Sequence, residues 1–431
     1  LIVKCNLPPS LIEHAGFKSF MSICSPRWKP ISARNIKQNL IKTLLKHAQE
    51  IIDSKLKNVI YLTVTVDIWT DRKTRGFIGI TGHFIDKNFV PQACLLDFVR
   101  LKGSHNAESL RQTTRRIVER LGLKDKIFRI ITDNAASMIK AFQFGLDVEL
   151  DETNNNANIT SSQGSLCDKD DIIDDDECVL QLVNWYPDAH DEATSESLLC
   201  LNTKRLSCFA HSLQLTVRDG LKKIPCIKKP LAKCHTLASL AHQSMKIQEL
   251  LETLSKQIKP ANVERWNAEL LLIKSIVLIG QNELTEITNA TEVIDILDPF
   301  YDVTIHVQSQ AVVTLSMVVP SIVHLLAHLI EIKTDLALLK AMVKQLQSSL
   351  EQRFSGIVKR LQLQEVNDTD PFSDPIYFVA AMLDPSFKWY WMSEMRYNIS
   401  DATDLKENIF SLIMTECKFE LKSAQEKSNS N

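Results

Sequence analysis

The chain has 431 residues, of which 50 are Lys or Arg and 52 are Asp or Glu, so its formal net charge is −2. The acidic residues are concentrated, because residues 147–196 hold 15 acidic side chains and one basic one. The other 381 residues therefore carry a net charge of +12. Near-neutrality does not exclude a polyanionic partner for this basic body. A hydrophobic content of 45% is typical of a globular protein, and the length predicts two or three domains.

The cysteine pattern and the hydropathy indicate the cellular compartment of the protein and whether it crosses a membrane. The ten Cys residues are scattered without a Cys-x-x-Cys pair, which predicts reduced thiols in an intracellular protein. No secretory signal peptide is visible. Residues 312–330 are uncharged and long enough to cross a bilayer, but Pro320, His324 and His328 favour a buried helix pair over a membrane span. We therefore expect no membrane partner.

The first elements follow from the spacing of apolar residues. Residues 32–55 predict an amphipathic helix. From residue 58 the period changes to two, and residues 59–66, 76–85 and 94–101 predict an antiparallel meander of three strands. Residues 107–121 predict a helix that ends at Gly122 and whose arginine face is either solvated or in contact with DNA phosphates. Residues 127–132 predict a fourth, buried strand, so we expect a mixed sheet.

The rest of the chain has two characters. The acidic stretch from residue 147 to about residue 199 lacks sustained periodicity and is predicted to be mostly disordered. From residue 206 onward the pattern is helical, with residues 376–383 as a candidate strand.

Two aspartates are the strongest site candidates. Asp67 and Asp133 each follow an apolar, strand-like run, where side chains project from the edge of a sheet. Two such carboxylates suit Mg²⁺ or Mn²⁺, and a metal pair would support phosphodiester chemistry once a third carboxylate is supplied. The alternative is that both aspartates only cap strand ends or form turns. Asp71 is a weaker candidate.

An ordered series of motifs resembles the hAT superfamily of DNA transposases, and in particular the domesticated zinc-finger BED-type proteins derived from them. The resemblance implies an α/β fold, with a ribonuclease-H-like mixed-sheet core interrupted by a large all-helical insertion. The motifs are Thr65-Val66-Asp67-Ile68-Trp69-Thr70, Gly82-His83-Phe84, Ile131-Thr132-Asp133-Asn134, Cys208-Phe209-Ala210-His211, Arg265-Trp266-Asn267, Leu297-Asp298-Pro299-Phe300 and Met382-Leu383-Asp384-Pro385.

The same resemblance implies roles for six residues. Asp67 and Asp133 match the first two catalytic, metal-binding aspartates. Cys208 and His211 match a motif that lines the active site, although a helical Cys-x-x-His is also half of a zinc site; without a second pair of ligands, no zinc site is evident. Arg265 and Trp266 match a DNA-binding pair, in which the indole stacks on a flipped base. The alternative for Trp266 is a core anchor at a helix start.

Two departures from the family pattern bear on activity. No BED zinc finger precedes the core, and the third acid, a Glu from a C-terminal dimerisation region, is not found, so we expect a C-terminally truncated core. Glu394 in Ser393-Glu394-Met395-Arg396 lies too close to Lys388 in sequence to replace it. The expected divisions are an N-terminal helical segment (1–55), the first part of the core (56–146), the acidic insert (147–200), core helices (201–262), the helical insertion (263–370) and a partial return to the core (371–431).

Three functions remain open at this stage. The first is a catalytically inactive, transposase-derived nuclear protein that binds DNA, and protein partners or itself, in gene regulation. The second is an active cut-and-paste transposase that requires Mg²⁺ or Mn²⁺ and whose last catalytic segment lies outside this chain. The third is a helical protein-interaction scaffold without affinity for DNA.

Overall fold

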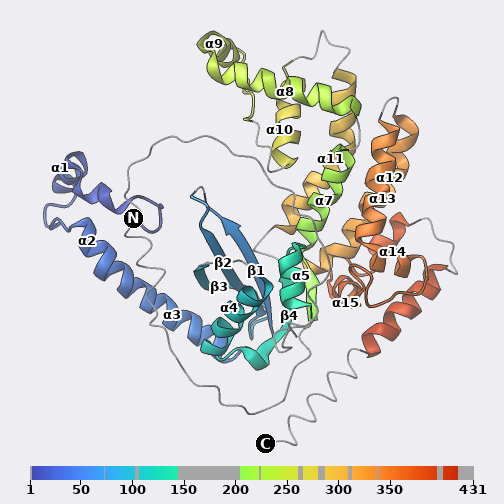
Figure 1. Ribbon diagram of the computed structural model, residues 1–431, viewed down its shortest axis with the longest axis horizontal. Helices are drawn as coiled ribbons and strands as arrows, with labels where there is room; N and C mark the ends of the chain where they lie inside the picture. Colours follow the sequence, from blue (N-terminus) through green and yellow to red (C-terminus); the bar gives the residue numbers. More distant parts are fainter. Residues whose placement is uncertain are drawn as a thin grey trace, which may run out of the picture. The chain divides into compact units, whose positions relative to one another are not determined.

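The computed structural model describes residues 2–71, 73–101, 106–143, 204–222, 225–260, 266–279, 287–308, 313–336, 339–395 and 401–415. The chain divides into two compact units (Figure 1). The first comprises Leu1–Ile131 with Ala135–Arg205, and the second comprises Thr132–Asn134 with Leu206–Asn431. The predicted disorder of the acidic insert, residues 147–199, lies outside the described residues.

The first unit is built on a five-stranded sheet in the order β3-β2-β1-β4-β5. β1 pairs antiparallel with β2, and β2 pairs antiparallel with β3, which confirms the predicted meander. The sheet as a whole is mixed, as expected for a ribonuclease-H-like core. The strands are β1 (Leu62–Thr70), β2 (Gly76–Ile85), β3 (Pro91–Leu101), β4 (Ile127–Thr132) and β5 (Lys204–Ser207).

One face of this sheet carries the hydrophobic core of the first unit. The β-branched run of β1 alternates, so that Val64 and Val66 are buried while Asp67 is exposed. Leu110 and Ile117 of α4 (Ala107–Arg120) pack into the same core, together with residues of α5 (Ala136–Phe142). Asn106 caps α4, because its side chain accepts a hydrogen bond from the backbone N–H of Ser109. A 3-10 turn, η3 (Lys124–Lys126), leads into β4.

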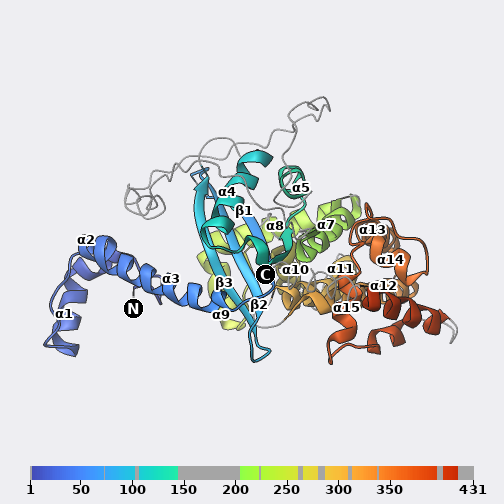
Figure 2. The same ribbon diagram turned by 90° about the horizontal axis from the view of Figure 1, so that it is seen from below.

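An N-terminal arm, residues 2–57, extends from the sheet (Figure 2). Its anchor is the C-terminal end of the long helix α3, where Leu56 is buried and Lys126 Nζ donates hydrogen bonds to the carbonyls of Leu56 and Lys57. The predicted amphipathic helix is confirmed, but most of its apolar stripe, including Leu44 and Ile51, is exposed. The elements of the arm are η1 (Pro9–Glu13), α1 (Ala15–Cys24), α2 (Ala33–Asn35), η2 (Ile36–Leu40) and α3 (Ile41–Lys57).

The second unit is helical around an aromatic core. Phe354 lies between Phe209 and Phe372, with ring centroids 5.4 and 4.6 Å away, and Phe372 contacts Tyr377 at 5.2 Å. Its elements are α7 (Phe209–Lys222), α8 (Pro225–Gln243), α9 (Met245–Thr253), α10 (Trp266–Val277), α11 (Ile287–Val307), η4 (Leu315–Met317), α12 (Val318–Asp335), α13 (Lys340–Arg353), α14 (Ser355–Leu361), α15 (Ile376–Leu383), η5 (Tyr390–Glu394) and a helix over residues 401–415.

Two predictions for the second half of the chain were wrong. The candidate strand at residues 376–383 is the helix α15, which packs on η4 and α12. Residues 204–207, which the helical pattern did not distinguish, form the edge strand β5. In the described part of the chain, one helical stretch, Leu315–Thr334, is long and apolar enough to cross a membrane by length and composition. Val319, Ile322 and Leu325 of this stretch are fully buried in the second unit, as in a core helix.

Candidate functional site

Asp67 lies inside β1 rather than at its end. β1 continues for three residues beyond it, and the backbone of Asp67 pairs opposite Gly79 of β2. The expectation that Asp67 ends its strand was therefore wrong, and so was the alternative that it only caps a strand. Its carboxylate is exposed, and Oδ1 accepts a hydrogen bond from the N–H of Ile68 at 3.0 Å.

The surroundings of Asp67 on this face of the sheet are aromatic. Trp69, two residues further along β1, covers Gly79: a Cβ atom there would meet the indole ring at 3.1 and 3.2 Å. The indole lies 6.1 Å from the ring of Phe77 and 5.2 Å from that of Phe98, and Trp69 and Phe98 are 40% and 38% exposed. The absence of a side chain at position 79 thus lets the indole lie flat on the sheet beside Asp67.

A second polar pair lies further along the same strands. Thr65 Oγ1 is 3.1 Å from Nε2 of His83, which belongs to the Gly-His-Phe motif. Burial lowers the pKa of His83, which favours the neutral imidazole. This contact orients the ring with respect to β1.

Asp71, the weaker candidate, builds the turn between β1 and β2. Its carboxylate accepts hydrogen bonds from the N–H groups of Lys73 and Arg75 and forms an ion pair with the Arg75 guanidinium at 2.6 Å. Desolvation raises the pKa of Asp71, but the hydrogen bonds and charge of Arg75 outweigh it, so the pKa lies below its ordinary value. These contacts give Asp71 a structural role.

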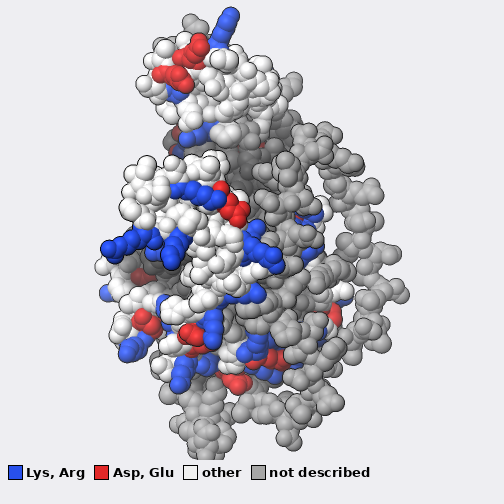
Figure 3. Space-filling model, turned by 90° about the vertical axis from the view of Figure 1, so that its left-hand side faces the viewer, with Lys and Arg blue, Asp and Glu red and all other residues white. Residues whose placement is uncertain are grey.

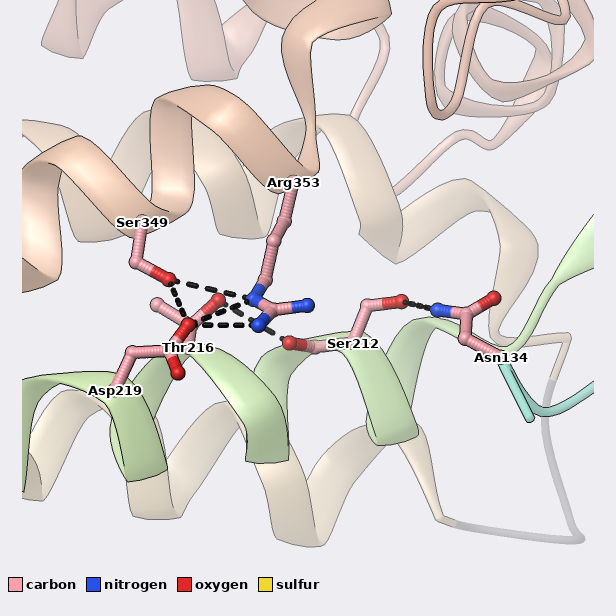
Figure 4. Close-up of polar contacts among 6 residues, drawn as sticks. All are labelled: Asn134, Ser212, Thr216, Asp219, Ser349 and Arg353. Atoms are coloured by element: carbon pink, nitrogen blue, oxygen red, sulfur yellow. Dashed lines mark hydrogen bonds and ion pairs between the residues drawn. The ribbon is translucent and has the colours of Figure 1, made fainter. Parts of the chain in front are cut away.

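Asp133 directly follows β4, as predicted, in the segment Thr132–Asn134 that belongs to the second unit. The N–H of Cys208 donates to the Thr132 carbonyl at 2.8 Å, which ties the start of α7 to this strand end. Asn134 Nδ2 donates to Ser212 Oγ at 2.9 Å (Figure 4). The Ser212 hydroxyl donates in turn to the Cys208 carbonyl. The first turn of α7 therefore holds both sides of Asp133.

The same helix is fixed at its other end. Oδ2 of Asp219 accepts hydrogen bonds from Ser349 Oγ at 2.9 Å and from Arg353 Nη2 at 2.7 Å, both on α13 (Figure 4). Asp219 and Arg353 are each about one-third exposed, so their charges are partly screened. Sequence reasoning missed Ser212, Asp219 and Arg353, because their partners lie 78 to 134 residues away along the chain.

The remaining candidates lie in the second unit or outside the described residues. Cys208 directly precedes α7 and His211 lies on its first turn, and both are partly exposed. Among the described residues, no group of three or more His, Cys, Asp or Glu residues could hold a metal ion. Trp266, the first residue of α10, is only 6% exposed, as in the core-anchor alternative. Arg265 lies outside the described residues. Glu394 Oε2 lies 3.2 Å from His324 Nδ1 of α12 at the surface.

Comparisons with known proteins centre on the segment that carries both aspartates. Residues 65–160 match the ZBED1 RNase-like domain. The chain is 27% identical over 137 residues to the zinc finger BED domain-containing protein DAYSLEEPER of Arabidopsis thaliana, a match that covers 32% of this chain and 20% of that protein. The chain is also 28% identical over 137 residues to a Zea mays protein named as an AC transposase. This match covers 32% of this chain and 17% of the maize protein.

A third relative widens the range of functions. The chain is 26% identical over 138 residues to a Talaromyces stipitatus protein named as the transcriptional regulator tpeD, a match that covers 32% of this chain and 16% of that protein. The matches thus span about a fifth or less of the length of these relatives. Together with the family match at residues 65–160, they confirm the resemblance to hAT transposases and BED-type proteins over about a third of the chain.

Proposed function

We propose that the chain is a transposase-derived nuclear protein that binds DNA in gene regulation and does not cleave it by itself. The observation that carries the proposal is the position of Asp67 and Asp133 within the segment that matches an RNase-like domain, on β1 and directly after β4, which are neighbours in the sheet. Relatives named as a regulator and as a transposase are similar to about a third of this chain. Phosphodiester recognition is the chemistry that these relatives suggest.

The chain's own groups fit a divalent cation only in part. Asp67 offers an exposed carboxylate on a strand, and the start of α7 holds the Thr132 carbonyl and the Asn134 side chain on either side of Asp133. Oxygen ligands of this kind suit Mg²⁺ or Mn²⁺, which when bound would polarise a phosphate and lower the pKa of a bound water. Two carboxylates without a third hold such an ion weakly, so we expect DNA binding to be retained and cleavage to be absent.

A second candidate is favoured by the names of the maize relatives. If a third acid reaches Asp67 and Asp133 from outside the described residues, the protein would be an active Mg²⁺-dependent or Mn²⁺-dependent transposase. In that case α7 would act as a brace that fixes the direction of Asp133, and the aromatic surface around Trp69 would restrict the approach of water to Asp67.

The two candidates separate in one experiment. Purified chain is incubated with labelled duplex DNA and with supercoiled plasmid in Mg²⁺ or Mn²⁺, and binding and nicking are measured for the wild type, Asp67→Asn and Asp133→Asn. Asp125→Asn, which changes an exposed aspartate in η3, is the matched control. Binding without nicking supports the main proposal. Nicking that both site variants abolish and the control retains establishes the transposase, and no binding to any DNA would refute both in favour of a helical scaffold.

A further inference from the structure

The N-terminal arm, residues 2–57, is strongly basic. It holds 10 Lys and Arg residues against 3 Asp and Glu, a net charge of +7. The 381 residues outside the acidic stretch carry +12 in total, and residues 204–259 have a comparable excess of 11 Lys and Arg over 3 Asp and Glu. The arm lies outside the matched segment 65–160, so the comparison with the RNase-like domain assigns nothing to it.

Most of these cations are presented to solvent. Before α3, Arg27, Lys29 and Arg34 of α2 are exposed. On α3, Lys46 and Lys57 are exposed. Figure 3 looks at the chain from the side of α1 to α3, and over these N-terminal helices blue Lys and Arg side chains predominate. The arm's three carboxylates are too few to neutralise them.

The other basic surface of this unit is different. On α4, Arg111 pairs with Glu108 at 3.0 Å, Arg115 pairs with Glu119 at 2.8 Å, and Arg120 pairs with Asp97 of β3. Three arginines of α4 are therefore paired with carboxylates of α4 and β3, and one of them, Arg111, is buried rather than solvated. A polyanion gains more from the arm, where 10 cations face only 3 carboxylates and binding releases condensed counterions.

We propose that the N-terminal arm is a binding surface for the phosphate backbone of duplex DNA, separate from the surface around Asp67 and Asp133. This inference rests on the proposed function, because that function makes DNA the polyanion that the protein meets. Exposed Lys and Arg on helices contact phosphates without reading bases, so the arm contributes affinity and a steep salt dependence rather than sequence specificity.

The test removes three charges from the arm and compares them with three removed elsewhere. Lys29, Arg34 and Lys46 are changed together to Gln, and the matched control changes Lys333, Lys340 and Lys344, exposed residues of α12 and α13, to Gln. The affinity of the full chain for a 30-base-pair duplex is measured by fluorescence anisotropy across a series of salt concentrations. Circular dichroism of each variant checks that the helices are intact.

The arm variant is expected to bind at least about tenfold more weakly near 0.1 M salt, and the slope of log K against log salt should fall by about 2 to 3, or about 0.9 for each lost phosphate contact. The control should change the slope by less than about 1. Equal effects of the two variants, or none, overturn the proposal while leaving DNA binding itself in place. If wild-type chain binds no DNA, the proposed function fails first. If the arm instead binds polyglutamate as tightly as DNA, its partner is an acidic protein and the proposal is wrong.

Discussion

Gly220 lies in the last part of α7, where this helix packs on α13. A Cβ atom at this position would lie 2.4 Å from Cδ2 and 2.7 Å from Cγ of Leu346, a side chain with no exposed surface. Elsewhere in a helix, replacing Gly with Ala stabilises the protein by about 1 kcal/mol. Here we predict the opposite sign for Gly220→Ala, because Leu346 is enclosed and both of its contacting atoms would have to move.

The magnitude follows from two opposing terms. Overpacking of a closed core costs about 1–3 kcal/mol, and the gain in helix propensity offsets about 1 kcal/mol of it, so the net destabilisation should be about 1 kcal/mol. In a unit of this size, that corresponds to a fall of about 2–4 °C in Tm. Urea unfolding followed by the helical circular dichroism signal measures the free energy directly.

A double-mutant cycle separates the clash from other effects. Leu346→Ala alone should destabilise the second unit by about 2–5 kcal/mol through the cavity it leaves. In the double variant the new methyl group at position 220 partly fills that cavity, so Gly220→Ala should now stabilise the protein, with a coupling energy of about 1 kcal/mol or more. If Gly220→Ala stabilises the otherwise unchanged chain by about 1 kcal/mol, as an ordinary helical glycine would, the close packing of α7 on α13 is refuted.

Three further predictions concern the sheet and the charge distribution. Gly79→Ala should displace the Trp69 ring, because two of its atoms lie 3.1 and 3.2 Å from the new Cβ. We expect a destabilisation of about 1 kcal/mol and a changed near-ultraviolet circular dichroism spectrum. An unchanged spectrum would argue against the indole lying on Gly79. The pKa of Asp71 is depressed below its ordinary value of 3.8, so the stability contributed by its carboxylate is present above about pH 4 and is lost as the pH falls through the folded-state pKa. In urea titrations, Asp71→Asn should therefore lose less stability than the wild type between about pH 6 and about pH 3. Parallel losses in the two proteins would contradict this. Deletion of residues 147–196, which carry a net charge of −14, should tighten DNA binding and steepen its salt dependence in anisotropy titrations, and identical titrations would make that stretch a spacer.

The sheet could be predicted from the sequence because its signals are local. Alternation of β-branched and polar residues located β1 and β2, and the motif residues located Asp67 and Asp133. The end of β1 was misplaced, because the residues after Asp67 lose the alternating pattern and are held in the strand by pairing with β2 as far as Gly76. Such pairing is a property of the neighbouring strand and is not encoded in the residues of β1 alone.

Other features depend on contacts between distant residues. Residues 376–383 form a continuous apolar run, which does not distinguish a buried strand from a short buried helix, and packing on η4 and α12 accompanies the helix. The four residues of β5 are too few for a periodic signal. The bond between Asn134 and Ser212, which braces the candidate site, spans 78 residues and leaves no trace in either local sequence.

The anchoring of α3 by its C-terminal end sets a length scale for any DNA that the protein engages. The helix has 17 residues and rises about 1.5 Å per residue, so it carries the elements before it about 26 Å beyond the point where Lys126 binds its last carbonyls. At about 3.4 Å per base pair, that distance corresponds to roughly seven or eight base pairs. The stretch of DNA contacted by the arm would therefore be displaced from the stretch contacted near β1 by less than a full turn of duplex. Shortening α3 by one helical turn would bring the two contacted stretches closer by one or two base pairs.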